Sequence, residues 1–98
     1  MDFVSIYKNM EVTYGELEKA LLSLHYTKKK GKDFYGFENK FFDSVVLVPL
    51  TAQPNEMVSR LRFDSTSRLL EAKGVIAHKD DLAKMIERER LSAQQVSA

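Results

Sequence analysis

YTKKKGKDFYGFENKFFDSVVLVPL, residues 26–50, gives the clearest indication of the fold class. Short runs of aromatic and β-branched residues alternate in it with turn-forming residues, which is the pattern of three consecutive strands. Lys30-Gly31 is expected to close the first hairpin, because glycine adopts the positive φ of a tight turn without steric cost. Asn39-Lys40 offers a second reversal, since asparagine tolerates the left-handed region. We therefore expect a three-stranded antiparallel sheet.

Helical patterns lie on both sides of this stretch. Thr13 and Glu16 have the spacing of a capping box, in which each side chain bonds the backbone amide of the other residue, and an apolar stripe follows. This predicts a helix from Tyr14 to about Leu24. After the strands, apolar and small residues share one helical face from about Arg60 to Lys73, and Gly74 is well placed to end that helix in the left-handed conformation.

The two ends of the chain extend this core. Residues 1–11 form an N-terminal extension, in which apolar residues recur at helical spacing and predict a short helix, although an extended segment is equally compatible. A further amphipathic helix is predicted at about residues 79–91, and residues 92–98 have no apolar period and are expected to form a flexible tail. Residues 1–91 are thus read as a single domain with a core at about 12–76.

Composition limits the classes of function. The chain has 98 residues, a formal net charge of +1 and no cysteine. The absence of cysteine excludes disulfides, thiolate catalysis and cysteine-ligated zinc, and it is compatible with a reducing compartment. The pattern indicates a soluble cytoplasmic protein without a membrane segment, and no motif calls for a metal, a cofactor or a small-molecule ligand. Any affinity for nucleic acid must come from a local cluster of basic residues.

The predicted fold class is α+β, with helices packed on one face of the antiparallel sheet and the C-terminal helix added. Residues 45–48, VVLV, are apolar at every position, which is typical of a strand covered on both faces. Two explanations remain open at this point. The N-terminal segment or the third helix covers the second face, or a second copy or a partner protein docks on this strand.

Four segments carry a family resemblance: TYGELEKALLSLHY, KKGKDFYGF, VVLVP and RLLEAKGVI. Together they resemble the HicA-like family of small bacterial proteins over approximately Val12 to Ile76. The resemblance implies the double-stranded-RNA-binding-like order of helix, three strands and helix. It also implies a toxin–antitoxin context, in which the better-known members are ribonucleases that cut messenger RNA and are neutralised by an antitoxin protein.

The catalytic position of this family differs in the present chain. The resemblance places a histidine shortly after the glycine of the first hairpin, and Asp33 stands there instead. An exposed aspartate is ionised at neutral pH and cannot donate a proton as an imidazolium can, so the resemblance carries over the fold but argues against nuclease activity at this position. An endoribonuclease that recruits His25 remains an alternative, although His25 is also suited to a helix C-terminus.

The basic cluster is the candidate binding surface. The predicted nucleic-acid-binding residues surround the first turn and include one aromatic side chain: Lys28, Lys29, Lys30, Lys32, Lys40 and Tyr35. Lysines bind phosphates, and exposed aromatic rings stack on unpaired bases. Alternatively, the charges protect an exposed hairpin from edge-to-edge association. We therefore expect RNA binding, with a non-catalytic protein-interaction domain as the competing reading, in which an antitoxin-like partner or a second copy docks on residues 45–48 or on the C-terminal helix.

Overall fold

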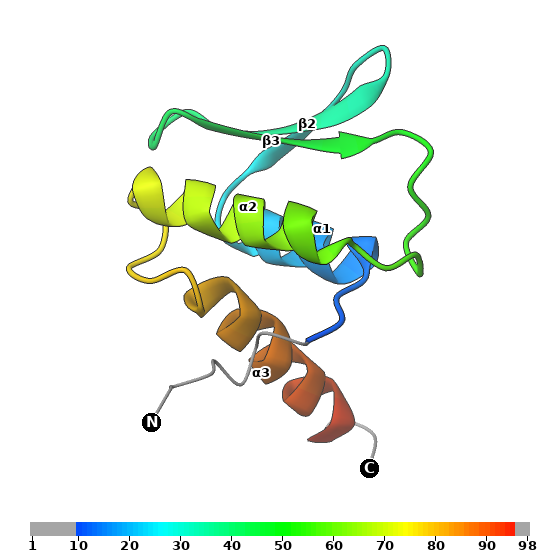
Figure 1. Cartoon of the computed structure of the whole chain (residues 1–98), viewed down its shortest axis with the longest axis vertical. Coiled ribbons are helices and arrows are strands. Elements are labelled where there is room, and N and C mark those ends of the chain that lie inside the picture. The colour runs from blue at the N-terminus through cyan, green and yellow to red at the C-terminus, as the bar shows by residue number, and fades with distance from the viewer. Residues whose placement is uncertain (1–9, 96–98) are drawn as a thin grey trace.

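The computed structural model describes residues 10–95, and they form an α+β fold with three layers (Figure 1). The three-stranded antiparallel sheet is the first layer, with strand order β1-β2-β3. Helices α1 and α2 lie side by side under one face of the sheet, and α3 lies beneath them, on the side away from the sheet. The elements are α1 (Tyr14–Ser23), β1 (Thr27–Lys30), β2 (Phe34–Asn39), β3 (Ser44–Pro49), α2 (Arg60–Ala72) and α3 (Asp81–Gln95).

Helix α1 begins and ends with the local interactions that its sequence predicts. The hydroxyl of Thr13 accepts a hydrogen bond from the Glu16 amide, and the Glu16 carboxylate accepts one from the Thr13 amide, so the capping box is confirmed. At the other end, His25 adopts a positive φ of 69°. The His25 amide donates to the carbonyl of Leu22 and the Tyr26 amide donates to that of Leu21, which is a Schellman motif with histidine in the position usually held by glycine.

The two hairpins form where they were predicted but close differently. The first turn spans residues 31–33, and Gly31 does not have a positive φ. A glycine is needed there for another reason: a Cβ on residue 31 would lie 2.8 Å from the carbonyl oxygen of Phe34. In the second hairpin, the left-handed residue is Asp43, with φ of 53°, rather than Asn39. Asn39 instead uses its side chain to accept from the Phe42 amide and to donate to the carbonyl of Leu24.

The core lies between the sheet and the helices. Phe37, Val46 and Val48 point from the sheet into this layer and are buried, as are Leu17 and Leu21 on α1. Within residues 10–95 the second face of residues 45–48 is not covered, so cover by the N-terminal segment or by a partner stays a prediction. Val45 and Leu47 are 49% and 52% exposed, so β3 alternates between a covered and an open face.

The cover predicted for the open face is not supplied by the third helix. Helix α3 packs against α1 on the side away from the sheet, and its buried residues include Leu82, Ala83 and Ile86. The other proposed cover, the N-terminal segment, falls mostly on residues 1–9, which lie outside the described residues, as does the short helix considered there. Within residues 10–95, one face of the sheet is therefore open.

The C-terminal half follows the sequence prediction with one extension. Helix α2 ends at Ala72, and Gly74 has a positive φ of 78°, as expected of the residue after a helix C-terminus. Helix α3 continues to Gln95, so residues 92–95, expected in the tail, are helical, and residues 96–98 are not described. None of the helices in the described part of the chain is long and apolar enough to cross a bilayer.

Candidate nucleic-acid interface

The lysines of the first hairpin do not share one direction. Lys28 lies opposite Phe37 in the sheet, and its side chain reaches towards α1, where its ammonium pairs with the carboxylate of Glu18. The Lys28 ammonium also lies over the ring of Tyr35, 4.2 Å from the ring centroid. An ion pair together with a cation–π contact holds this charge on the helical side of the sheet. Lys28 is therefore a structural cation rather than a free phosphate ligand.

The next lysines leave positive charge at the hairpin. Lys29 is on the open face, where its ammonium lies 3.7 Å from the carboxylate of Glu38, and both side chains are partly exposed. Such an exposed pair contributes little to stability and exchanges readily with other partners. Lys30 and Lys32 are exposed and have no carboxylate within ion-pair distance among residues 10–95. Lys30 and Lys32 thus provide the uncompensated charge.

A shallow groove of about 300 Å³ lies on the open face next to these lysines. Its floor is formed by Gly36, where the missing side chain leaves the surface low, and its apolar wall by Phe34, Val45 and Leu47. Phe34 is 41% exposed and lies on the strand that leaves the turn. An aromatic ring, an apolar wall and adjacent ammonium groups are the elements that bind an unstacked base and its phosphates.

Tyr35 and Lys40, both predicted to belong to the interface, lie elsewhere. Tyr35 points to the helical side, is half-buried against the core and carries the Lys28 ammonium on its ring. Lys40 follows the last residue of β2 and is therefore at the opposite end of the sheet from the Lys32 turn, across a six-residue strand of roughly 20 Å. Lys29, Lys30 and Lys32 line the groove at the turn, although Lys30 lies opposite Tyr35 and so leaves the strand on the helical side. Phe34 replaces Tyr35 as the aromatic group of this surface.

The two weak catalytic candidates are also apart. His25 precedes β1 and Asp33 follows the turn at the other end of that strand, so four extended residues, roughly 13 Å of strand, separate them. Both residues are exposed, and no described side chain forms an ion pair with either. A general acid–base pair needs its members within reach of the same reacting group, so this arrangement does not form one. Within the described residues, no group of three or more metal-ligating side chains occurs.

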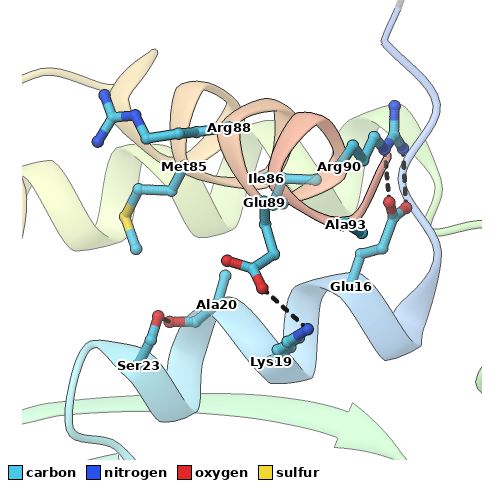
Figure 2. A pocket seen from close by; sticks show the side chains of 10 residues that line it. All are labelled: Glu16, Lys19, Ala20, Ser23, Met85, Ile86, Arg88, Glu89, Arg90 and Ala93. Carbon is cyan, nitrogen blue, oxygen red and sulfur yellow. Dashed lines mark hydrogen bonds and ion pairs between the residues drawn. The ribbon is translucent and has the colours of Figure 1, made fainter. Parts of the chain in front are cut away.

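A second hollow lies between α1 and α3, with a volume of about 470 Å³ (Figure 2). Its floor is apolar, with Ala20 from α1 and Met85, Ile86 and Ala93 from α3. Two ion pairs cross its rim, from Lys19 to Glu89 at 2.9 Å and from Arg90 to Glu16. Because these contacts tie α3 to α1, we interpret this hollow as part of the seam between the two helices.

The sequence does not indicate that Arg62, Val45 and Leu47 contribute to the surface at β3. Arg62 donates from its guanidinium to the carbonyl oxygen of Leu47 over 3.1 Å, a contact between α2 and β3 that no sequence spacing indicates. Val45 and Leu47 were treated as covered because the run is apolar throughout. The chain order places this strand at a sheet edge, but it does not indicate which face of the strand is open.

Comparison with protein-family models, with curated proteins and with solved structures found no match to this chain.

Proposed function

We propose that this chain is an RNA-binding domain that holds single-stranded RNA against the open face of its sheet, at the end formed by the first hairpin. The observation that carries the proposal is the placement of Phe34 beside Lys29, Lys30 and Lys32 around one groove. The resemblance of the sequence to HicA-like proteins points to the same class of ligand. Single-stranded RNA fits better than a duplex, because an exposed ring stacks only on a base that is free of its partner.

Each group has a separate role in this proposal. Lys30 and Lys32 bind phosphates, because their charges have no carboxylate partner among the described residues. Lys29 exchanges its exposed pairing with Glu38 for a phosphate. Phe34 stacks on a base, with Leu47 contacting the base edge from the neighbouring strand. No residue is assigned to cleavage, because Asp33 and His25 are at opposite ends of β1.

The test is a titration of a fluorescein-labelled mixed-sequence RNA 12-mer, followed by anisotropy. We expect the double substitution Lys30→Ala/Lys32→Ala to weaken binding roughly 10–30-fold at 0.1 M salt, as estimated from about 0.7 logarithmic units of salt dependence per lost phosphate contact. The matched control is Lys40→Ala/Lys79→Ala, which removes the same charge from positions away from the groove. Equal weakening by both double variants would mean that net charge, and not this surface, governs binding.

Phe34→Ala tests the aromatic contribution separately. Stacking of one base on an aromatic ring is worth about 1–3 kcal/mol, so the variant is expected to lose fivefold or more in affinity for single-stranded RNA. The same loss is not expected for an RNA duplex, whose bases are already stacked. If affinity for the single strand is unchanged in Phe34→Ala, the ring does not take part.

A further inference from the structure

The outer edge of the sheet is open along β3. Strand β3 pairs with β2 on one side, and no strand formed by residues 10–95 lies on the other. In the antiparallel register, Leu47 lies opposite Gly36 and Val45 opposite Glu38. The Leu50 amide donates to the carbonyl of Asp33 at the start of β2, and the residues that bond the neighbouring strand alternate along β3. Val45 and Leu47 therefore direct their N–H and C=O groups to the free edge, where the Leu47 carbonyl accepts from Arg62.

A groove of about 490 Å³ runs along this edge, between β3 and α2. Its walls are apolar or small: Val45 and Leu47 on the strand, and Leu61, Ser65 and Leu69 on the helix. Leu61 is 79% exposed and leaves an apolar side chain at the mouth of the groove. A strand edge beside a helix offers backbone hydrogen bonds on one side and side-chain pockets on the other.

The charge in the groove belongs to Arg62. Its guanidinium donates to the Leu47 carbonyl over 3.1 Å, and no carboxylate of residues 10–95 lies within ion-pair distance of it. A guanidinium has five N–H donors in a planar fork that matches a carboxylate, and here most of those donors are available. The groove therefore combines backbone groups that pair with a strand, apolar walls and one positive charge without a counterion.

We propose that this groove binds an extended segment of a partner protein, which adds to the sheet as a fourth strand next to β3 and places a carboxylate on Arg62. The backbone of the segment pairs with Val45 and Leu47, and apolar side chains at alternate positions contact Leu61 and Leu69. This inference concerns the free edge of β3 rather than the open face of the sheet; Val45 and Leu47 border both surfaces, but the inference does not depend on RNA binding.

Charge complementarity selects a partner over a second copy of this chain. If β3 paired with β3 of a second copy, the added strand would be SVVLVP, which contains no acidic residue. Both copies of Arg62 would then be displaced from the Leu47 carbonyl without gaining a carboxylate, and two uncompensated guanidinium groups would be brought to one interface. An acidic extended segment satisfies the backbone edge and Arg62 together.

The experiment pans a phage-displayed library of random heptapeptides against the full chain. We expect enrichment of sequences with apolar residues at alternate positions and one Asp or Glu at a fixed position between them. A synthetic peptide of the enriched sequence should bind about tenfold more tightly than the same peptide with Gln or Asn in place of the acid. In Arg62→Gln this preference should fall below about twofold. On binding, the amides of Val45 and Leu47 should become protected from hydrogen exchange.

Two variants distinguish binding in the groove from nonspecific binding of the peptide. Ser65 is exposed in the groove, so Ser65→Trp fills it without changing the core and should abolish peptide binding. Ser92→Trp makes the same change on the exposed surface of α3 and should leave binding intact. The proposal is overturned if no motif is enriched, if Arg62→Gln retains the acid preference, or if Ser65→Trp binds the peptide as well as the parent chain. It is also overturned if sedimentation shows a dimer in which Val45 and Leu47 are protected without peptide.

Discussion

The guanidinium of Arg90 on α3 donates to the carboxylate of Glu16 on α1, a contact that joins residues 74 positions apart. Glu16 at the same time completes the capping box of α1, and Arg90 also donates to the carbonyl of Glu11. The start of α1, the entering chain and the added helix are thus fixed by one pair of side chains. The hydrogen bond from Arg90 lowers the pKa of Glu16 from 4.5 to about 2.

Arg90→Gln is expected to destabilise the domain in a pH-dependent manner. The folded pKa of Glu16 lies below its unfolded value, so its contribution is present above about pH 4.5 and is lost as the pH falls towards 2. After allowance for partial exposure, we expect a loss of about 1–2 kcal/mol at pH 7. The free energies of unfolding of the parent protein and of Arg90→Gln are measured in urea between pH 7 and pH 2. The difference between these two free energies should shrink below about pH 4.5.

The control for this change is Arg88→Gln on the same helix. Arg88 forms no ion pair within the described residues, so its replacement should change the free energy of unfolding by less than about 0.5 kcal/mol. The role given to Glu16 would be contradicted if the difference in the free energy of unfolding between the parent protein and Arg90→Gln stays constant from pH 7 to pH 2.

His25→Gly is expected to stabilise the protein. A non-glycine residue at a φ of 69° lowers the stability by about 1–2 kcal/mol. Glycine removes this cost, but its greater freedom in the unfolded chain offsets part of the gain. The expected net gain is about 0.5–1 kcal/mol, seen as a rise in Tm. His25→Ala is the matched control, because it removes the imidazole and keeps the unfavourable φ. If the parent protein produces RNA fragments and neither variant does, His25 has a role in RNA cleavage in addition to its role at the end of the helix.

Much of this fold is readable from local sequence, because its signals act over a few residues. The capping box at Thr13 and the glycine after α2 determine helix boundaries without reference to the rest of the chain. The alternation of β3 could not be read, because Val45 and Leu47 are apolar although they face outwards. Hydrophobicity identifies a strand but does not say which of its faces the helices cover.

The candidate sites were harder to read because they depend on side-chain partners distant in sequence. Lys28 and Lys30 are alike in the sequence, yet Glu18 neutralises the first and no described carboxylate pairs with the second. Arg62 reaches Leu47 across the packing of α2 on β3, and that contact exists only in the folded chain. The number of lysines in the sequence therefore overestimates the free positive charge of the first hairpin, and the sequence does not indicate the contact made by Arg62.

Gly31→Ala should destabilise the first hairpin because the added Cβ comes too close to a neighbouring backbone atom, and not because residue 31 has a positive φ. A Cβ at residue 31 would meet the Phe34 carbonyl oxygen at 2.8 Å, so the turn must shift, at an expected cost of about 1–2 kcal/mol. Gly36→Ala is the control in the neighbouring strand, where an added Cβ meets no atom within 4 Å and stability should be unchanged or slightly raised. Equal Tm values for Gly31→Ala and the parent protein would show that the turn adapts freely.

The salt dependence of RNA affinity reports directly on whether Lys30 and Lys32 bind phosphates. Dissociation constants of the labelled 12-mer are measured from 50 to 300 mM salt for the parent protein, Lys30→Ala/Lys32→Ala and Lys40→Ala/Lys79→Ala. If Lys30 and Lys32 bind phosphates, the logarithmic slope of the first double variant should be shallower than that of the parent by about 1.4, and the slope of the control should not change. An RNA affinity that is absent in the parent protein, or a slope that the Lys30 and Lys32 changes leave unaltered, would contradict the account.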